Sequence, residues 1–359
     1  MTGATGFVYS DDYLKYNFGP SHPFQPIREK NTFALLNELG VFGEKVRHYE
    51  PKPASETDLY LAHSDGYVKF VKKMSDVGSG YLDYGDTPAS KGIYEGSLAV
   101  VGGSIMCADL IMNGGVSHAF NPGGGLHHAK SDRAAGFCVF NDIAITIRYI
   151  QKKYGVKRIA VVDIDGHYGD GTQEILRREP IMKIDLHRSG MGFYPGTGFV
   201  DEIGEGEGEG YSINVPLPAG TGDNAYLKAF TELVPPLIRS YKPEILLNQF
   251  GVDGHYADPL VGLSLTTKTF GTVASVLHSL ASELCQGKYL IFGGGGYSPV
   301  DVVRCWATMF LTISGINSYK LEKVSDSGSI RDDEATIKAV NEVIADVKGR
   351  LFSLHGLDI

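Results

Sequence analysis

The sequence has little cysteine and no long segment that is apolar throughout. Its 359 residues include four cysteines, none of them in a CxxC pair, too few for a disulfide framework. We interpret them as reduced, mostly buried thiols of a cytoplasmic protein. There is no uninterrupted apolar run of about 18 residues, the length that a membrane span needs. The start, MTGATGFVYS, lacks the basic and apolar regions of a signal peptide. We therefore expect no membrane segment and no secretion signal.

The sequence also lacks an excess of positive charge. Its formal net charge of -9 disfavours a general affinity for nucleic acid or anionic membranes. A basic partner, such as a protein surface that carries lysine, is compatible with this charge. We find no internal repeat, and GEGEGEG at 204–210 is interpreted as an exposed turn between strands. The sequence therefore predicts a single domain that spans residues 1–359.

Apolar strand-like runs alternate with helical segments along the chain. The predicted strands are 6–10, 115–121, 158–165, 181–187, 211–217, 244–253 and 289–296. The predicted helices are 93–114, 141–155, 224–241, 267–287, 298–314 and 333–352. Continuous apolar strands are typical of parallel sheets that are buried on both faces. The pattern predicts an α/β fold with one open, mainly parallel β-sheet and helices on both faces.

Chemically reactive side chains stand at the ends of four predicted strands. They are His127 and His128 after 115–121, the group Asp163, Asp165, His167 and Asp170 around the end of 158–165, Asp253 at the end of 244–253, and Tyr297 after 289–296. Ligands bind beyond the carboxyl ends of strands in such sheets. We therefore expect these side chains to meet at one edge of the sheet.

Asp165 and His167 stand two residues apart, so an extended strand would place them on the same side, with Asp163. Asp253 from another strand would complete a set of three ligands. Three protein ligands and an open position are typical of catalytic metal sites. Oxygen and nitrogen ligands together suit Zn²⁺ or Fe²⁺ and tolerate Mn²⁺ or Co²⁺. The alternative is a hydrogen-bond network at the strand end that binds no metal.

His127 and His128 follow three glycines in NPGGGLHHAK. They could act as a general acid/base pair, with Asp163 and Asp170 available to orient them. Tyr297 follows FGGGG, and its hydroxyl could donate a hydrogen bond to an oxyanion. No GK[ST] follows these glycines, which excludes a P-loop. Together the residues predict metal-assisted hydrolysis of a carbonyl compound.

Seven segments resemble the histone deacetylase superfamily, which has the arginase/deacetylase fold. They are NPGGGLHHA, GFCVFND (136–142), DIDGHYGDGTQ (163–173), YPGTG (194–198), EIGEGEGEGYSINVPL (202–217), GVDGHYADPLVGLSLT (251–266) and GGGGYSP. YNFGPSHPFQPIR (16–28) and GDTPASKGIYE (85–95) are most similar to its prokaryotic acetoin-utilisation branch. The resemblance covers about 7–315, the expected catalytic core, and leaves 316–359 as a C-terminal helical segment.

The resemblance implies a role for each matching residue. It implies that Asp165, His167 and Asp253 bind the metal, with zinc the usual ion and Fe²⁺ an option. It implies an Asp163–His127 dyad, an Asp170–His128 dyad in which His128 is the general base and acid, and Tyr297 as the residue that polarises the carbonyl. The activity it implies is removal of acetyl groups from lysine side chains of proteins, with an acyl-CoA synthetase as the expected target of this branch.

The same resemblance implies a tunnel for the acyl-lysine. Gly136, Phe137, Tyr194 and Leu260 match its walls, and Asp86 matches the acid at the rim that holds the substrate backbone. Tyr194 stands where relatives often have phenylalanine, which would make the tunnel more polar. Arg28 matches the arginine of an internal exit channel for acetate.

Two features depart from the family pattern. Family members bind potassium near the active site, and the matching residues here are Asp163, Asp165, His167, Asp185 and Leu186. The family has serine where this chain has Asp185. Many relatives have histidine where this chain has Tyr168, a position that is no metal ligand, so we expect an effect only on packing or on the groups that surround the metal ligands.

Three other functions compete with protein deacetylation. The first is a small-molecule amidohydrolase, for example one that acts on acetylpolyamines. A narrow, acidic mouth would favour it, whereas Asp86 supports a peptide substrate, and no long insertion is seen in 10–30. The second is a manganese ureohydrolase, which needs further acidic ligands. The third is a binder of acyl-lysine without activity, which would predict loss of Tyr297 or a metal ligand.

Overall fold

The computed structural model describes residues 3–190, 192–316, 318–328 and 330–358. Met1, Thr2 and Ile359, which belong to the predicted domain, lie outside the described residues, as do Met191, Asn317 and Ser329. The strands are β1 (Thr5–Val8), β2 (Val46–Tyr49), β3 (His118–Asn121), β4 (Ile159–Asp163), β5 (Met182–Arg188), β6 (Ser212–Leu217), β7 (Ile245–Gln249) and β8 (Tyr289–Phe292). The α-helices are α1 (Ile27–Glu38), α2 (Glu56–Leu59), α3 (Asp65–Val77), α4 (Ile93–Met112), α5 (Asp142–Tyr154), α6 (Asp170–Leu176), α7 (Asp223–Tyr241), α8 (Thr267–Leu284), α9 (Asp301–Ile313), α10 (Ser318–Glu322) and α11 (Glu334–Val347).

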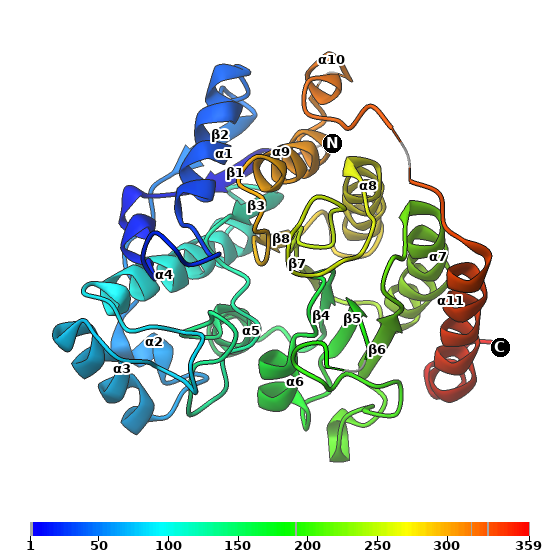
Figure 1. Cartoon of the computed structure of the whole chain (residues 1–359), viewed down its shortest axis with the longest axis horizontal. Coiled ribbons are helices and arrows are strands. Elements are labelled where there is room, and N and C mark those ends of the chain that lie inside the picture. The colour runs from blue at the N-terminus through cyan, green and yellow to red at the C-terminus, as the bar shows by residue number, and fades with distance from the viewer. Residues whose placement is uncertain (1–2, 191, 317, 329, 359) are drawn as a thin grey trace.

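The strands form one open sheet in the order β2-β1-β3-β8-β7-β4-β5-β6 (Figure 1). Each of the seven pairings between neighbouring strands is parallel. The predicted α/β fold with one open sheet is therefore confirmed, and within the described residues the sheet is parallel throughout. β3, β8, β7 and β4, the strands expected to carry the reactive residues, are consecutive neighbours at its centre.

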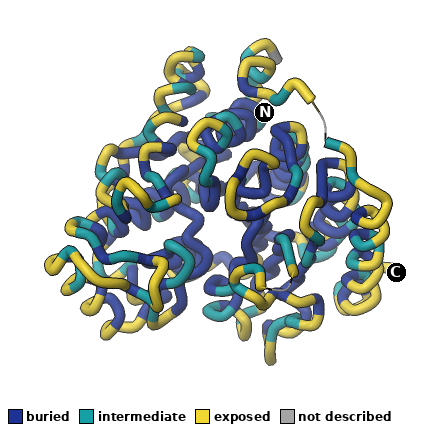
Figure 2. Tube along the Cα trace, viewed as in Figure 1, coloured by how far each residue is buried: buried dark blue, intermediate teal, exposed yellow. Residues whose placement is uncertain are grey.

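Helices cover both faces of the sheet because its strands are apolar on both faces. In β4, Ala160 and Val162 belong to one hydrophobic core, which also contains residues of α7, α8 and α9. Ile159 and Val161 belong to a second core with residues of α4 and α5. Figure 2 shows the buried central trace beneath helices whose outer sides are exposed.

Helix α4 combines unusual length with low polarity. Its most apolar window of 18 residues has a mean hydropathy of 1.4, so the helix is long and apolar enough to cross a membrane by length and composition. The helix contacts β3, β1, β8 and α5, and 61% of that window is buried inside the protein. These contacts explain its composition as that of a core helix.

The predicted ends of four strands were wrong: β1 ends at Val8 instead of 10, β8 ends at Phe292 instead of 296, and β4 and β7 also end early. β4 ends at Asp163, whereas the prediction extended it to 165. Asp165 N donates to Asp163 Oδ1 (3.2 Å) and His167 N donates to Asp165 Oδ1 (3.0 Å), so the chain turns instead of remaining extended. β7 likewise ends at Gln249, and Asp253 lies in the loop that follows it. The strand alternation used to group these ligands therefore does not apply.

The regions before residue 93 and after residue 316 contain elements of their own. The edge strand β2 and the helices α1, α2 and α3 were not predicted. The predicted helix 333–352 corresponds to α11 and a wider turn over Lys348–Phe352. α11 packs against α7 and β6, as Figure 1 shows beside the C-terminus. The GEGEGEG segment lies in the loop before β6 and contains one short turn at Gly206–Gly208.

Candidate metal-dependent active site

Asp165, His167 and Asp253 form a buried cluster beyond the ends of β4 and β7. One ligand atom from each residue lies within 4.8 Å of the others. His167 Nδ1 is 2.8 Å from Asp253 Oδ2 and 3.4 Å from Asp165 Oδ1. The three side chains predicted as ligands are therefore in reach of one ion.

Backbone and amide donors orient both carboxylates of this cluster. Asp165 Oδ2 accepts hydrogen bonds from Gly295 N (2.7 Å) and Gln249 Nε2 (2.8 Å). Asp253 Oδ1 accepts one from Gly166 N (2.6 Å). Each acid thus has one oxygen fixed and the other near His167. A side chain at position 295 would not fit, because a Cβ there would lie 2.4 Å from Asp253 Oδ2.

The electrostatics of the cluster favour a bound cation. Burial raises the pKa of Asp253, and the charge of Asp165 raises it further. Two buried carboxylates that face each other are unfavourable unless a cation lies between them. The O, N, O donor set with its outer hydrogen bonds fits a divalent metal with an open position. The residues present therefore fit the metal that the resemblance implies.

Acid should weaken metal binding at this cluster. Without metal, burial lowers the pKa of His167, but Asp253 and Asp165 outweigh burial and raise it to about 10. At neutral pH the metal must then displace a proton, and apparent affinity should fall about tenfold for each pH unit of acidification around neutrality. Competition with a chromophoric chelator between about pH 6 and pH 8 measures this slope. An affinity independent of pH would contradict the prediction.

His127 and His128 lie next to the cluster, and each is held by a carboxylate. His127 Nδ1 is 2.9 Å from Asp163 Oδ2, and His128 Nδ1 is 2.8 Å from Asp170 Oδ1. The two Nε2 atoms are 3.1 Å apart. Burial and the neighbouring His127 lower the pKa of His128 to about 4. His128 is therefore neutral at pH 7, with a nitrogen available to accept a proton.

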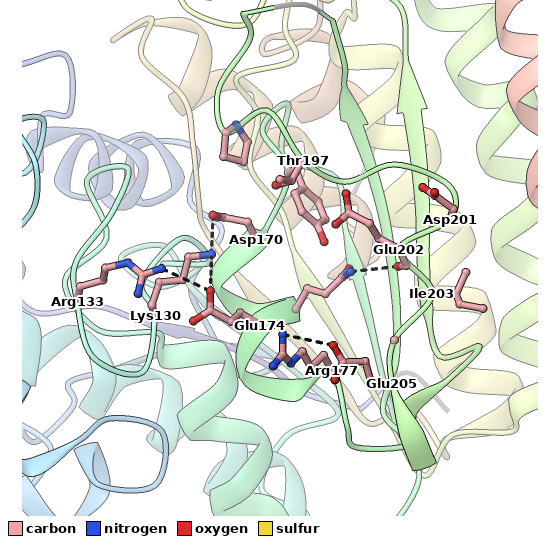
Figure 3. A pocket seen from close by; sticks show the side chains of 14 residues that line it. Lys130, Arg133, Asp170, Glu174, Arg177, Thr197, Asp201, Glu202, Ile203 and Glu205 are labelled. Atoms are coloured by element: carbon pink, nitrogen blue, oxygen red, sulfur yellow. Dashed lines mark hydrogen bonds and ion pairs between the residues drawn. The ribbon is translucent and has the colours of Figure 1, made fainter.

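Lys130 supports the second of these dyads. Its Nζ lies 2.6 Å from Asp170 Oδ2 and 3.4 Å from Glu174 Oε2, as Figure 3 shows. These residues line a polar cavity of about 430 Å³ beside α6. Arg177 and Glu205 also line this cavity. Lys130 thus balances the charge of Asp170 from the side opposite to His128 Nδ1. Sequence reasoning missed it, although it follows the histidines within HHAK.

A narrow cavity of about 270 Å³, the central cavity, reaches the cluster. The residues that line it are Asp86, His128, Gly136, Phe137, His167, Phe193, Tyr194, Leu260 and Tyr297. All five residues predicted for the rim and walls line this cavity. Phe193, which stacks on the His167 ring at 5.0 Å, is an additional wall residue. Its position beside Tyr194 in GFYPGTG was the signal available in the sequence.

One wall of the central cavity depends on an unusual backbone. Phe137 has φ of 67°, a region that costs a residue with a side chain about 1–3 kcal/mol. Its N–H donates to Thr87 Oγ1 (3.1 Å), and its carbonyl accepts from the Tyr16 hydroxyl (2.6 Å). At the preceding Gly136, a Cβ would lie 2.5 Å from His128 Cδ2. The absence of a side chain there lets His128 and Phe137 share the cavity.

Tyr297 lines the same cavity near His167. Their rings are 6.4 Å apart, and the Phe137 ring is 5.8 Å from Tyr297. Tyr297 N donates to Asp258 Oδ2 (2.7 Å), while Asp258 Oδ1 accepts from Leu260 N (2.9 Å). Asp258, which sequence reasoning did not select, thus links Tyr297 to a wall residue. Burial raises the pKa of Tyr297, so its hydroxyl keeps its proton at neutral pH.

Arg28 is buried behind this tyrosine and does not line the central cavity. Its Nη1 donates to Gly296 O (3.0 Å), and its guanidinium lies 5.0 Å from the Trp306 ring. Arg28 therefore contacts the residue that precedes Tyr297. The exit channel expected around it stays a prediction.

The contacts of Asp185 do not fit a potassium ligand. Its carboxylate accepts hydrogen bonds from Lys183 Nζ (2.6 Å), His187 Nδ1 (2.8 Å) and Gly169 N (3.0 Å). Burial raises the pKa of Asp185, but Lys183 and His187 outweigh it and leave the pKa below its usual range. A carboxylate already paired with an ammonium gains little from a second monovalent cation. Leu186 follows Asp185 within the same strand, β5.

The fold and the site together define a class, the metal-site hydrolases built on an open parallel α/β sheet. His167 of the buried O, N, O cluster lines the central cavity together with Tyr297 and with His128, one of the two histidines held by carboxylates. These groups can activate water and stabilise an oxyanion.

Within this class, the chain belongs to the histone deacetylase domain family, whose model matches residues 22–313. The acetoin utilization protein AcuC of Bacillus subtilis (strain 168) is 39% identical over 322 residues, 87% of this chain and 82% of that protein. AcuC of Staphylococcus xylosus is 38% identical over 325 residues, 88% of this chain and 84% of that protein. The crystal structure of the HDA15 HD domain has a TM-score of 0.85 at 28% identity and covers 99% and 97% of the two chains. The resemblance to the family is confirmed.

Proposed function

We propose that this protein is a zinc-dependent lysine deacetylase that hydrolyses N6-acetyl-lysine in proteins to lysine and acetate. The central cavity carries the proposal, because its apolar walls lead from the exposed Asp86 to His128, His167 and Tyr297. A narrow shaft of this kind suits the long methylene chain of a lysine. A metal bound at Asp165, His167 and Asp253 would polarise the acetyl carbonyl and activate a water.

The side chains around the cluster would move the protons. His128 Nε2 takes a proton from water and later delivers it to the lysine nitrogen that leaves. Asp170 holds His128 through Nδ1 (2.8 Å), so Nε2, whose neighbour is His127 Nε2 at 3.1 Å, is the nitrogen for this transfer. Tyr297 donates its hydroxyl proton in a hydrogen bond to the oxyanion, and Phe137 and Tyr194 enclose the methylene chain.

Several details of the proposal come from kinship and composition. Zinc is the usual ion of the family, and Fe²⁺ would suit the same donors. The resemblance to the acetoin-utilisation branch implies an acyl-CoA synthetase as the acetylated partner, and the relatives named acetoin utilization protein support membership of that branch. Four buried cysteines without a disulfide suit a reducing cytoplasm. Direct binding to nucleic acid or to a membrane is not part of the proposal.

A substrate panel tests the proposal. Acetyl-lysine peptides, including peptides from acyl-CoA synthetases, are compared with acetylpolyamines by kcat/KM, with metal analysis of the same sample. We expect the peptides to be preferred and the protein to contain one divalent ion at the cluster. Preference for an acetylpolyamine would assign the small-molecule amidohydrolase activity instead. Hydrolysis of neither class would contradict both.

Asp86 offers a separate test of peptide binding. Asp86→Ala should raise KM for an acetyl-lysine peptide by about tenfold, because a hydrogen bond to the peptide backbone is lost. The same change should leave KM for an acetylated diamine, which has no peptide backbone, nearly unaltered. Asp132→Ala, at a carboxylate that is 63% exposed, is the matched control. Equal effects on both substrates would contradict the assigned role.

A further inference from the structure

Strand β5 contains a buried lysine that the proposed reaction does not use. Only 2% of the Lys183 side chain is exposed, and its Nζ lies 2.6 Å from Asp185 Oδ2. A lysine ammonium is rarely buried without a partner, because it loses its hydration. Lys183 and Asp185 stand two residues apart on β5, so their side chains share one face of the sheet. The chain therefore places a fixed positive charge within the fold.

This ion pair lies beside the His127 dyad. In the parallel pairing of β4 and β5, Asp185 is the direct partner of Asp163, the acid that holds His127. Gly169 lies between them, since a Cβ on it would be 2.6 Å from Asp163 Oδ2 and 3.2 Å from Asp185 Oδ2. The two carboxylates thus approach the same point, and the ammonium on Asp185 offsets their combined negative charge.

Both departures from the family pattern contact this ammonium. Asp185, in the serine position, accepts its hydrogen bond, and the Tyr168 ring, in the histidine position, lies 4.8 Å from Lys183 Nζ. Tyr168 also packs on the His187 ring at 4.9 Å. An aromatic face and a carboxylate are the two surroundings that stabilise a buried cation. Asp185 and Tyr168 thus form one site for a cation, and the cation in it is the Lys183 ammonium.

We propose that Lys183 is a positioning residue that supplies, as part of the chain, the monovalent positive charge beside the Asp163–His127 dyad. The protein would then need no free potassium at this position. The lysine acts through Asp185 and Gly169 on the loop that carries His167, and it does not touch the substrate. The inference rests on the proposed function only where kcat is measured, because the melting temperature needs no substrate.

The salt dependence of the unmodified protein is the first test. Its kcat and its melting temperature should be the same in potassium, sodium and choline chloride at equal ionic strength. A saturable rise of either quantity with potassium, absent with choline, would show that a free ion is still required and would overturn the proposal. The melting temperature needs no substrate, so this arm remains valid if the proposed acetyl-lysine activity fails.

Variants provide the second test. Lys183→Met keeps the length of the side chain and removes its charge. This variant should lower kcat by about tenfold to a hundredfold, the range found when residues that support metal ligands are replaced. Its KM and its metal content should be retained. Lys183→Ala leaves room for an ion, and potassium should restore part of its kcat and raise its melting temperature. Lys338→Met removes an 80% exposed ammonium and is the matched control.

The variants can also contradict the proposal. Unaltered kcat in Lys183→Met, or no response of Lys183→Ala to potassium, would overturn it. If either variant fails to fold, the salt test on the unmodified protein decides. If the unmodified protein hydrolyses no acetyl-lysine substrate, the proposed function is refuted instead. The melting temperatures would still measure the role of Lys183.

Discussion

Removal of the divalent metal with a chelator should abolish hydrolysis of acetyl-lysine peptides, and addition of Zn²⁺ or Fe²⁺ should restore it. The reason is that none of the described residues that line the central cavity is a strong nucleophile. Asp165 and Asp253 are held by Gly295, Gln249 and Gly166 in positions that suit metal ligands. The loss should approach the whole rate enhancement, because both the activated water and the polarised carbonyl disappear.

The measurement combines turnover with metal analysis. Circular dichroism of the chelated protein is the control, since a fold that stays intact separates loss of chemistry from loss of structure. Titration with each ion then gives the number of ions that restore activity, and we expect one. Full turnover in protein shown to contain no metal would contradict the mechanism.

Tyr297→Phe should lower kcat by about a hundredfold to a thousandfold while metal content stays near one ion per chain. The variant removes only the hydroxyl, and the packing of the ring on Phe137 and His167 is retained. Burial keeps this hydroxyl protonated, so it is available as a donor throughout the neutral pH range. Its loss leaves the developing oxyanion with one donor fewer.

Steady-state kinetics on a peptide substrate check this result. The effect should fall on kcat far more than on KM, because the hydrogen bond forms with the transition state. Tyr60→Phe is the matched control, since that hydroxyl contacts Glu56 at the protein surface. An unaltered kcat in Tyr297→Phe would end the oxyanion assignment.

Sequence patterns predicted the centre of the fold better than its beginning. The central strands are continuous apolar runs, which buried parallel sheets require. α1 escaped prediction because Arg28, Glu29 and Thr32 are buried in it, so its apolar residues show no helical period. The strand β2 has four residues and lies at the sheet edge, where only Val46 is buried. Short or polar elements of this kind depend on tertiary contacts that a local pattern does not contain.

The candidate site was likewise predicted only in part from the sequence. Strand ends identified the reactive residues, yet the reasoning that Asp165 and His167 share a strand face was wrong. The two meet because hydrogen bonds from the backbone to Asp163 and Asp165 turn the chain. Lys183 was overlooked because a single lysine in IMKIDLHR gives no sign of its burial. Its partner, two residues further on, was the available signal.

The order of the strands determines when the metal cluster can form. β4 and β7 are neighbours in the sheet, but α6, β5, β6 and α7 separate them along the chain. Asp165 and Asp253 come within reach of one ion only after this distant pairing is complete, and such contacts form slowly. Metal uptake is therefore a late event of protein maturation. A nascent or truncated chain that ends before Asp253 cannot assemble the cluster, so tight binding of a divalent ion there would report that synthesis has passed this residue.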